Sequence, residues 1–239
     1  MRPGAAAAAV MLGAALLLGT GPAAAQLAPT ASEVAAYSGL HAAAHKGDLA
    51  RLRQLIAAGA PVNARDGYGR TPLHVATFAR QREVIRALAA AGADHGLLEA
   101  DRYDAVTIAA VADDEETLRV LLGLGASARL VTSRYDGTAL IAAAHLGHDG
   151  VVRQLIAAGA PLDHVNNLHW TAVIESIVLG NGQARHQAVL RALLDAGAST
   201  ELADAQGRLP LELARSRGYD AMARLISQAA AARRGKPPG

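Results

Sequence analysis

A repeat with a period close to 33 residues runs through most of this chain and limits what it can fold into. The dipeptide Gly-Ala recurs at intervals of 33, 33, 34 and 38 residues, beginning at Gly59, Gly92, Gly125, Gly159 and Gly197. A second series is aligned with the tetrapeptide Thr-Pro-Leu-His and has intervals of 33, 33, 34, 33 and 38 residues, beginning at Ser38, Thr71, Asp104, Thr138, Thr171 and Leu209. Because the two series agree, they predict six similar units packed side by side.

One unit, residues 66–94, predicts a turn followed by two short helices. Its Gly-rich turn at 66–69 favours a tight reversal of the chain. Thr71 and Pro72 suit the start of the first helix, because Thr caps a helix and Pro tolerates the first helical position. The second helix has an apolar face and ends before Gly92, a residue suited to a left-handed cap. Helices this short cannot bury their apolar faces alone, so each unit needs neighbours of its own kind.

Comparison of the two series also places the extra residues. One lies between Gly125 and Thr138, in a turn, and five lie between Thr171 and Gly197, where the two helices of unit five are joined. The loop at 181–188 is a candidate second contact site. The alternative is a tolerated insertion without a role, since loops accept additional residues more readily than helices do.

The period, the Thr-Pro-Leu-His at 71–74, the Ala-Ala-Ala-His-Leu-Gly at 142–147 and the closing Gly-Ala resemble the ankyrin repeat family, over about residues 33–230. The resemblance implies an all-α solenoid of about six helix–turn–helix repeats with short β-turn fingers. We expect a lead-in at 26–36, the repeat domain at 37–230 and a disordered tail at 231–239. Unit three, with Asp104-Ala105-Val106-Thr107, departs most from the pattern. Polar substitutions in the first and last units indicate capping repeats.

The first 25 residues predict a signal peptide. Arg2 supplies a positive start, an apolar run of about 15 residues follows, and Ala23-Ala24-Ala25 predicts cleavage after Ala25. The run is shorter than the ~20 residues that span a bilayer, although an uncleaved anchor is the alternative. We therefore expect a periplasmic bacterial protein with no membrane span in its mature form. Release from the cell is the alternative, in which the chain would act as a secreted effector on a host protein.

The sequence carries no recognisable catalytic motif. It contains no Cys, no Gly-x-Ser-x-Gly, no P-loop, no Gly-x-Gly-x-x-Gly after a strand and no His-Glu-x-x-His. A net charge of +2 gives no reason to expect a nucleic acid partner. The acidic run at 113–116 is predicted to begin a helix, where carboxylates are favourable. We expect a non-catalytic protein without a cofactor.

Histidine spacing leaves a metal-binding or enzymatic protein as the alternative function. His41 and His45 are four residues apart and His145 and His148 three apart, and both spacings can place two ligands on one helix face. However, His41 aligns with His74, for which the resemblance implies hydrogen bonds that tie the turn to the helix. We therefore expect these histidines to be structural and no metal to be bound.

The resemblance implies that protein partners bind on the concave side, at the turn tips and the exposed positions of the first helices. Six of the seven aromatic residues fall in this set by register, and Tyr and Trp are enriched among residues that dominate binding energy. We expect one continuous aromatic row, in a monomer that holds one or a few proteins. The alternative is that these rings pack on each other. The candidate partner-binding residues are Tyr37, His45, Tyr68, Arg70, Phe78, Tyr103, Tyr135, His145 and Trp170.

Overall fold

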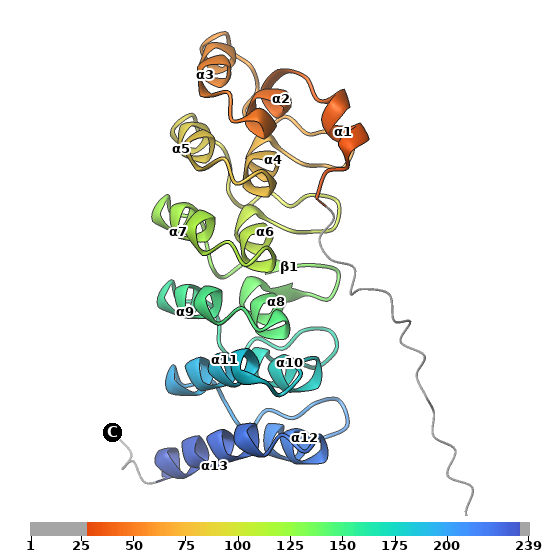
Figure 1. Ribbon diagram of the computed structural model, residues 1–239, viewed down its shortest axis with the longest axis vertical. Coiled ribbons are helices and arrows are strands. Elements are labelled where there is room, and N and C mark those ends of the chain that lie inside the picture. The colour runs from red at the N-terminus through yellow and green to blue at the C-terminus, as the bar shows by residue number, and fades with distance from the viewer. Residues whose placement is uncertain (1–27, 235–239) are drawn as a thin grey trace, which may run out of the picture.

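A computed structural model describes residues 28–234 and shows an array of helix pairs (Figure 1). After α1 (Ala31–Ala36), six pairs follow: α2 (Gly39–Lys46) and α3 (Leu49–Ala57), α4 (Pro72–Phe78) and α5 (Arg82–Ala90), α6 (Ala105–Val111) and α7 (Glu115–Gly123), α8 (Ala139–Leu146) and α9 (Asp149–Ala157), α10 (Ala172–Val178) and α11 (Ala184–Asp195), α12 (Pro210–Ser216) and α13 (Asp220–Arg234). First helices form one column and second helices another, and the loops between units extend beyond the first-helix column (Figure 1). The predicted all-α solenoid is confirmed.

The first helices begin where the Thr-Pro-Leu-His series predicts, because a polar residue caps them. The side chains of Thr71, Asp104, Thr138 and Thr171 each accept a hydrogen bond from the backbone N–H three residues on. Asp104 replaces Thr in the degenerate third unit and still satisfies an otherwise unpaired helix N–H. Unit three therefore remains in register although its tetrapeptide differs.

The Gly-Ala series marks the ends of the second helices. Gly92 has φ +85°, a left-handed conformation that Gly adopts without the strain imposed by a Cβ atom. Ala93 then turns back into the array, is 5% exposed, and its N–H donates to the Leu88 carbonyl at 2.9 Å. The core is the continuous apolar layer between neighbouring units, which includes Leu52, Leu88, Leu121, Leu155 and Leu193 from successive second helices. Each unit thus buries its apolar face against the next.

Unit five accommodates its five extra residues in two places. Its second helix, α11, has 12 residues where α5 has nine, so three of the five lengthen the helix. The connection at 179–183 has five residues where the one at 79–81 has three, which accounts for the other two. The insertion therefore extends a packed helix rather than forming a long exposed loop.

Both ends of the described region carry additional helix. α1 lies within the expected lead-in and is capped by Thr30 and Glu33, each of which bonds the backbone N–H of the other. At the other end α13 continues to Arg234, past the expected start of the tail at 231. The expected signal peptide at 1–25 and residues 235–239 lie outside the described residues. No helix between residues 28 and 234 is both long enough and apolar enough to cross a bilayer.

Candidate partner-binding face

Five fingers, residues 66–70, 99–103, 133–137, 166–170 and 204–208, join successive units and are built in the same way. In each, a side-chain oxygen of the first residue accepts hydrogen bonds from the N–H groups of the third and fifth residues. Asp66 Oδ1 accepts both at 2.8 Å, and Glu99, Ser133, Asn166 and Asp204 do the same. The side-chain oxygen of the first residue, with a backbone bond from the fourth N–H to the first carbonyl, therefore holds each tip.

The fingers are also connected to one another through their backbones. The Tyr68 carbonyl accepts from Ala100 N–H at 2.9 Å, and the Tyr135 carbonyl accepts from Asn167 N–H at 3.0 Å. In the third finger, strands β1 (Val131–Thr132) and β2 (Gly137–Thr138) form a two-stranded antiparallel pair, the only such pair in residues 28–234. The first four fingers are thus joined in one hydrogen-bonded layer.

The signature histidine fixes each of the first two fingers to a first helix. His74 Nδ1 accepts from Thr71 N–H at 3.0 Å, so Nε2 carries the proton and donates to the carbonyls of Leu97 and Tyr103 at 2.9 and 3.2 Å. Burial lowers the pKa of His74 to about 4, which keeps the ring neutral. His41 makes the equivalent bond to the Arg70 carbonyl at 2.9 Å. The structural role expected for these two histidines is confirmed.

The aromatic residues occupy two positions of the finger rather than the single row expected. Tyr68 and Tyr135 are third residues, at the tip, and are 49% and 51% exposed. Tyr103 and Trp170 are fifth residues, at the finger base, and Tyr37 holds the equivalent place before unit one; these three are partly buried. The two positions differ because the hydrogen bonds from the third and fifth N–H groups place those residues at different heights on the finger. The aromatic row is therefore two interrupted rows.

Arg70 is the candidate contact that the structure does not leave accessible. It is 3% exposed, and its guanidinium lies 3.0 Å from Glu33 Oε2 and 3.8 Å from Asp66 Oδ2. The same group lies 4.6 Å from the centre of the Tyr68 ring and 5.9 Å from that of Phe78. Hydrogen bonds from the Tyr68 side chain and the backbone of Thr30 lower the pKa of Glu33 to about 2. Arg70 therefore holds α1 against the first finger.

The last turns of the first helices lie beside the finger bases and complete what we call the finger face. Contacts such as Arg70 to Phe78, and Tyr37 to His45 with ring centres 6.4 Å apart, join the two. By register the last-turn positions are His45 and Lys46, Phe78 and Ala79, Val111 and Ala112, His145 and Leu146, Val178 and Leu179, and Ser216 and Arg217. Units two to five thus contribute mainly apolar side chains, between Lys46 at one end and Arg217 at the other.

Exposed apolar surface is concentrated in units four and five. Of the seven large apolar side chains that are exposed within residues 28–234, all except Tyr68 lie between residues 131 and 179. Four of these belong to the finger face by register, Tyr135, Leu146, Leu168 and Leu179, and we call them the apolar strip. Leu168 was absent from the sequence-based candidates, although its alignment with Tyr68 and Tyr135 at the tip position could have identified it. Elsewhere on this face, Tyr68 is the only exposed large apolar side chain within residues 28–234.

A buried carboxyl group lies next to the apolar strip. Glu175 is 5% exposed and occupies the register position that is Val75 in unit two. Its Oε1 accepts from the Asn166 side-chain amide at 2.9 Å, and its Oε2 lies 3.5 Å from His145 Nδ1. Burial raises the pKa of Glu175 to about 7 and lowers that of His145. Sequence reasoning missed Glu175, whose signal was a charged residue at an otherwise aliphatic or alanine position.

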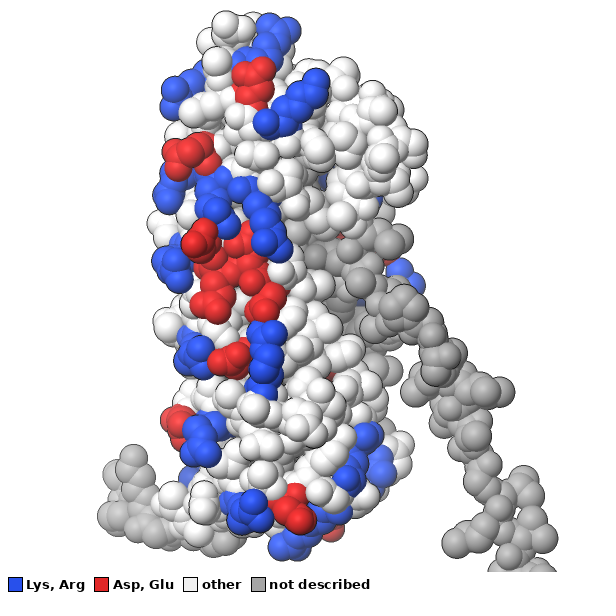
Figure 2. Space-filling model, viewed as in Figure 1, with Lys and Arg blue, Asp and Glu red and all other residues white. Residues whose placement is uncertain are grey.

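A charged network covers the edge where the two helices of a unit are joined, and Figure 2 shows its acidic groups enclosed by basic ones. Asp114 caps α7, as expected for the acidic run, and contacts Arg82 at 3.1 Å. Arg185, from the insertion in unit five, lies 2.7 Å from Asp113 Oδ2 and 3.6 Å from Asp149 Oδ1. The insertion is thus bound to units three and four.

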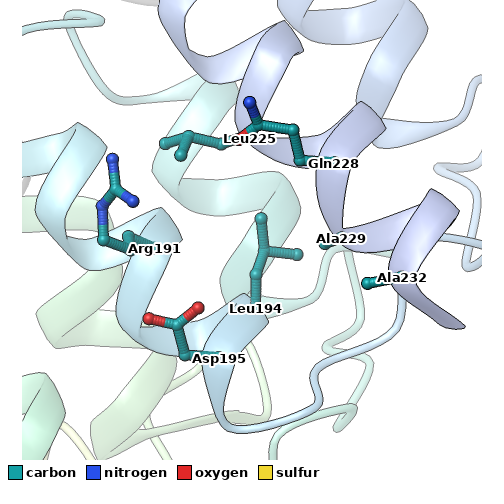
Figure 3. A pocket seen from close by; sticks show the side chains of 7 residues that line it. All are labelled: Arg191, Leu194, Asp195, Leu225, Gln228, Ala229 and Ala232. Carbon is teal, nitrogen blue, oxygen red and sulfur yellow. The ribbon is translucent and has the colours of Figure 1, made fainter.

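A cleft in the described region lies apart from the finger face. A cleft of about 220 Å³ between α11 and α13 (Figure 3) is lined by Arg191, Leu194, Asp195, Leu225, Gln228, Ala229 and Ala232. No candidate partner-binding residue lines this cleft.

Within residues 28–234, no three side chains of His, Asp or Glu come close enough together to hold a metal ion.

Comparison with known proteins agrees with this architecture. Residues 40–89 match the family described as "Ankyrin repeats (many copies)" and residues 106–198 match "Ankyrin repeats (3 copies)". The ankyrin repeat protein YahD of Escherichia coli strain K12 is 34% identical over 190 residues, which cover 79% of this chain and 94% of YahD.

Two solved structures extend the comparison. An ankyrin repeat domain from Acinetobacter baumannii AYE is 41% identical with a TM-score of 0.76, over 80% of this chain and 97% of that domain. The ankyrin repeat protein EF0377 is 28% identical with a TM-score of 0.72, over 80% and 98% of the two chains. The chain therefore belongs to the ankyrin repeat family, whose repeats form scaffolds for protein–protein interaction.

Proposed function

We propose that this chain is a non-catalytic scaffold that holds a protein partner against the apolar strip of units four and five. The observation that carries the proposal is the concentration of exposed apolar side chains between residues 131 and 179. Contiguous apolar surface on a soluble protein commonly marks an interaction site, and buried aromatic and aliphatic anchors supply most of the binding energy.

The construction of the finger face favours tight binding. The fingers of units four and five are held by their own hydrogen bonds and joined by the bond from Asn167 N–H to the Tyr135 carbonyl, so their backbone is already ordered before a partner arrives. Binding to a preformed surface loses less conformational entropy than binding that must order a loop. With a spacing of about 10 Å between packed helices, units four and five together offer a length suited to one short helix or strand of a partner.

We also propose that the scaffold acts in the periplasm of a bacterium. The support is the sequence of the first 25 residues, with a positive start, a short apolar run and Ala23-Ala24-Ala25. The test is fractionation of cells that produce the full chain, followed by sequencing of the N-terminus of the recovered protein. A periplasmic protein that begins at Gln26 is expected; a cytoplasmic protein that begins at Met1 would contradict this part of the proposal.

The binding proposal is tested by capture from the periplasmic fraction of the native host, with the mature chain as bait. A triple variant, Leu146→Gln, Leu168→Gln and Leu179→Gln, should lose the captured protein, because each change places a polar group in the apolar contact. The control is Val165→Gln, which alters an apolar side chain of similar exposure, 43%, that lies outside the apolar strip. Circular dichroism must show equal helix content. Capture by the triple variant at the wild-type level would refute the assignment of the strip.

A further inference from the structure

The position of Glu175 in the fold makes its carboxyl group unusual in this array. In the other five units the same register position, on the first helix, is occupied by alanine or by a larger aliphatic residue: Ala42, Val75, Ile108, Ala142 and Leu213. Glu175 is nevertheless 5% exposed, so the carboxyl group has lost most of its contact with water. A buried carboxylate is strongly disfavoured unless a cation or several hydrogen bonds compensate for it.

The compensation present in the described residues is incomplete. Asn166 donates its amide to Oε1, and this amide cannot be turned over, because its oxygen already accepts from Leu168 N–H and Trp170 N–H. No hydrogen bond in residues 28–234 reaches Oε2, which faces His145 Nδ1 at 3.5 Å. Oε2 is not among the fully buried unpartnered atoms of residues 28–234, so it remains open to a donor that the array does not supply.

No cation of the array compensates for the carboxyl group. On α8, the facing titratable group is His145, whose pKa is lowered by burial and then by His186 of α11 and by His148, so its ring is neutral at pH 7. On the fourth finger the facing group is the uncharged Asn166. Burial raises the pKa of Glu175, only the Asn166 hydrogen bond opposes it, and no Lys or Arg of the described region, α12 included, contributes. Burial thus keeps Glu175 protonated well above the pH at which an exposed Glu ionises.

We infer that Glu175 and His145 form a subsite for a cationic side chain, Lys or Arg, of the bound protein. A guanidinium or ammonium group would donate to Oε2 and supply the charge that the array lacks, so that Glu175 releases its proton to solvent and becomes a paired carboxylate. The subsite adjoins the apolar strip, because His145 precedes Leu146 and Asn166 holds the backbone of Leu168. This inference rests on the proposed function, because the cationic side chain belongs to the protein partner.

The decisive experiment does not require the partner. The mature chain, 26–239, is labelled with carbon-13 in its Glu side chains, and the carboxyl signal of Glu175 is followed from pH 4 to pH 9 with and without ethylguanidinium chloride. Because the cation binds only the ionised form, it should lower the apparent pKa of Glu175 in a saturable manner. Tetramethylammonium at the same ionic strength cannot donate a conventional hydrogen bond and should leave it unchanged. Glu83, whose side chain is 75% exposed, serves as the internal reference for salt effects.

Three results would overturn the inference: no displacement of the Glu175 titration, an equal displacement by tetramethylammonium, or an equal displacement at Glu83. Stronger displacement by micromolar Zn²⁺ than by ethylguanidinium would also do so, because it would assign the pair to a metal.

Capture experiments separate this inference from the proposed function. Since the ionised fraction of a group with a pKa near 7 changes about tenfold between pH 6 and pH 8, affinity for the captured protein should rise about tenfold over that interval. Glu175→Gln should remove this dependence, whereas Glu83→Gln should retain it. If the strip variants abolish capture and Glu175→Gln leaves its pH dependence intact, the subsite is refuted and the scaffold proposal stands.

Discussion

Replacing Glu175 with Gln should alter how the stability of the array depends on pH, because the buried carboxyl group opposes folding once it ionises. Gln has nearly the same shape, and its carbonyl can accept the amide of Asn166 as Glu175 Oε1 does at 2.9 Å. The substitution therefore removes the titration while keeping the packing and the hydrogen bond. Any pH-dependent difference between the two proteins then reports on Glu175 itself.

The sign and size follow from its pKa, which is about 7 in the folded protein against an ordinary value of 4.5. A carboxyl group whose folded pKa is raised stabilises the fold below the unfolded pKa, and this stabilisation is lost as pH rises through 7. A difference of 2.5 units corresponds to about 3 kcal/mol in total, of which about 2 to 3 kcal/mol falls between pH 5 and pH 8. The unfolding free energy of Glu175→Gln, relative to that of wild type, should therefore rise by about 2 to 3 kcal/mol between pH 5 and pH 8.

The assay is equilibrium unfolding in urea at pH 5, 6, 7 and 8, followed by circular dichroism and by fluorescence of Trp170, the single tryptophan. Guanidinium chloride is unsuitable, because guanidinium is a cation of the class that Glu175 is inferred to bind. Glu83→Gln is the control and should follow wild type at every pH. A constant difference between wild type and Glu175→Gln from pH 5 to pH 8 would refute the reasoning.

Three other substitutions test the structural elements around the finger face. Between pH 7 and pH 5, the unfolding free energy of wild type in urea should fall by about 2 kcal/mol, because the lowered pKa of His74 makes folding less favourable as pH falls below 6.5. His74→Gln should not show this decrease, and parallel curves for the two proteins would contradict the reasoning. Arg70→Ala should lower the unfolding free energy by about 2 kcal/mol and speed hydrogen exchange in α1, whereas Arg86→Ala, which disrupts an exposed pair, should change stability by less than about 0.5 kcal/mol; unchanged exchange in α1 would show that Arg70 does not hold it. Gly147→Ala should lower the melting temperature more than Gly92→Ala, since both glycines have positive φ but only the new Cβ at 147 would meet a side chain, at 2.9 Å; equal effects would mean that backbone strain alone matters.

The sequence was sufficient for the architecture because each unit repeats the same local physics. A capping residue starts the first helix, a glycine in the left-handed region ends the second, and both recur at the same interval. Even the degenerate unit three could be placed, since Asp104 is as able as Thr71 to bond the N–H groups of a first helix turn. Where a signal is local and repeated six times, one irregular unit does not hide it.

The binding face was harder to predict because register does not describe what a side chain meets in three dimensions. Arg70 shares the position of Tyr103 and Trp170, yet α1 supplies Glu33 as its partner and buries it. Glu175 is charged, and only the structure shows that Asn166 from another element accommodates it. These contacts join residues distant in sequence, so no repeat pattern records them.

The way each finger is held also bears on how such a protein changes over evolution. Since an oxygen of the first residue and bonds within the turn hold the tip, as at Asn166 in the fourth finger, the side chain of the third residue, Leu168, forms no hydrogen bond with the finger backbone. Substitutions there can accumulate with little penalty to folding, and a new surface chemistry can arise on an unaltered skeleton. Two relatives with superimposable helices are therefore free to have unrelated ligands, and selection on recognition can act almost independently of selection on stability.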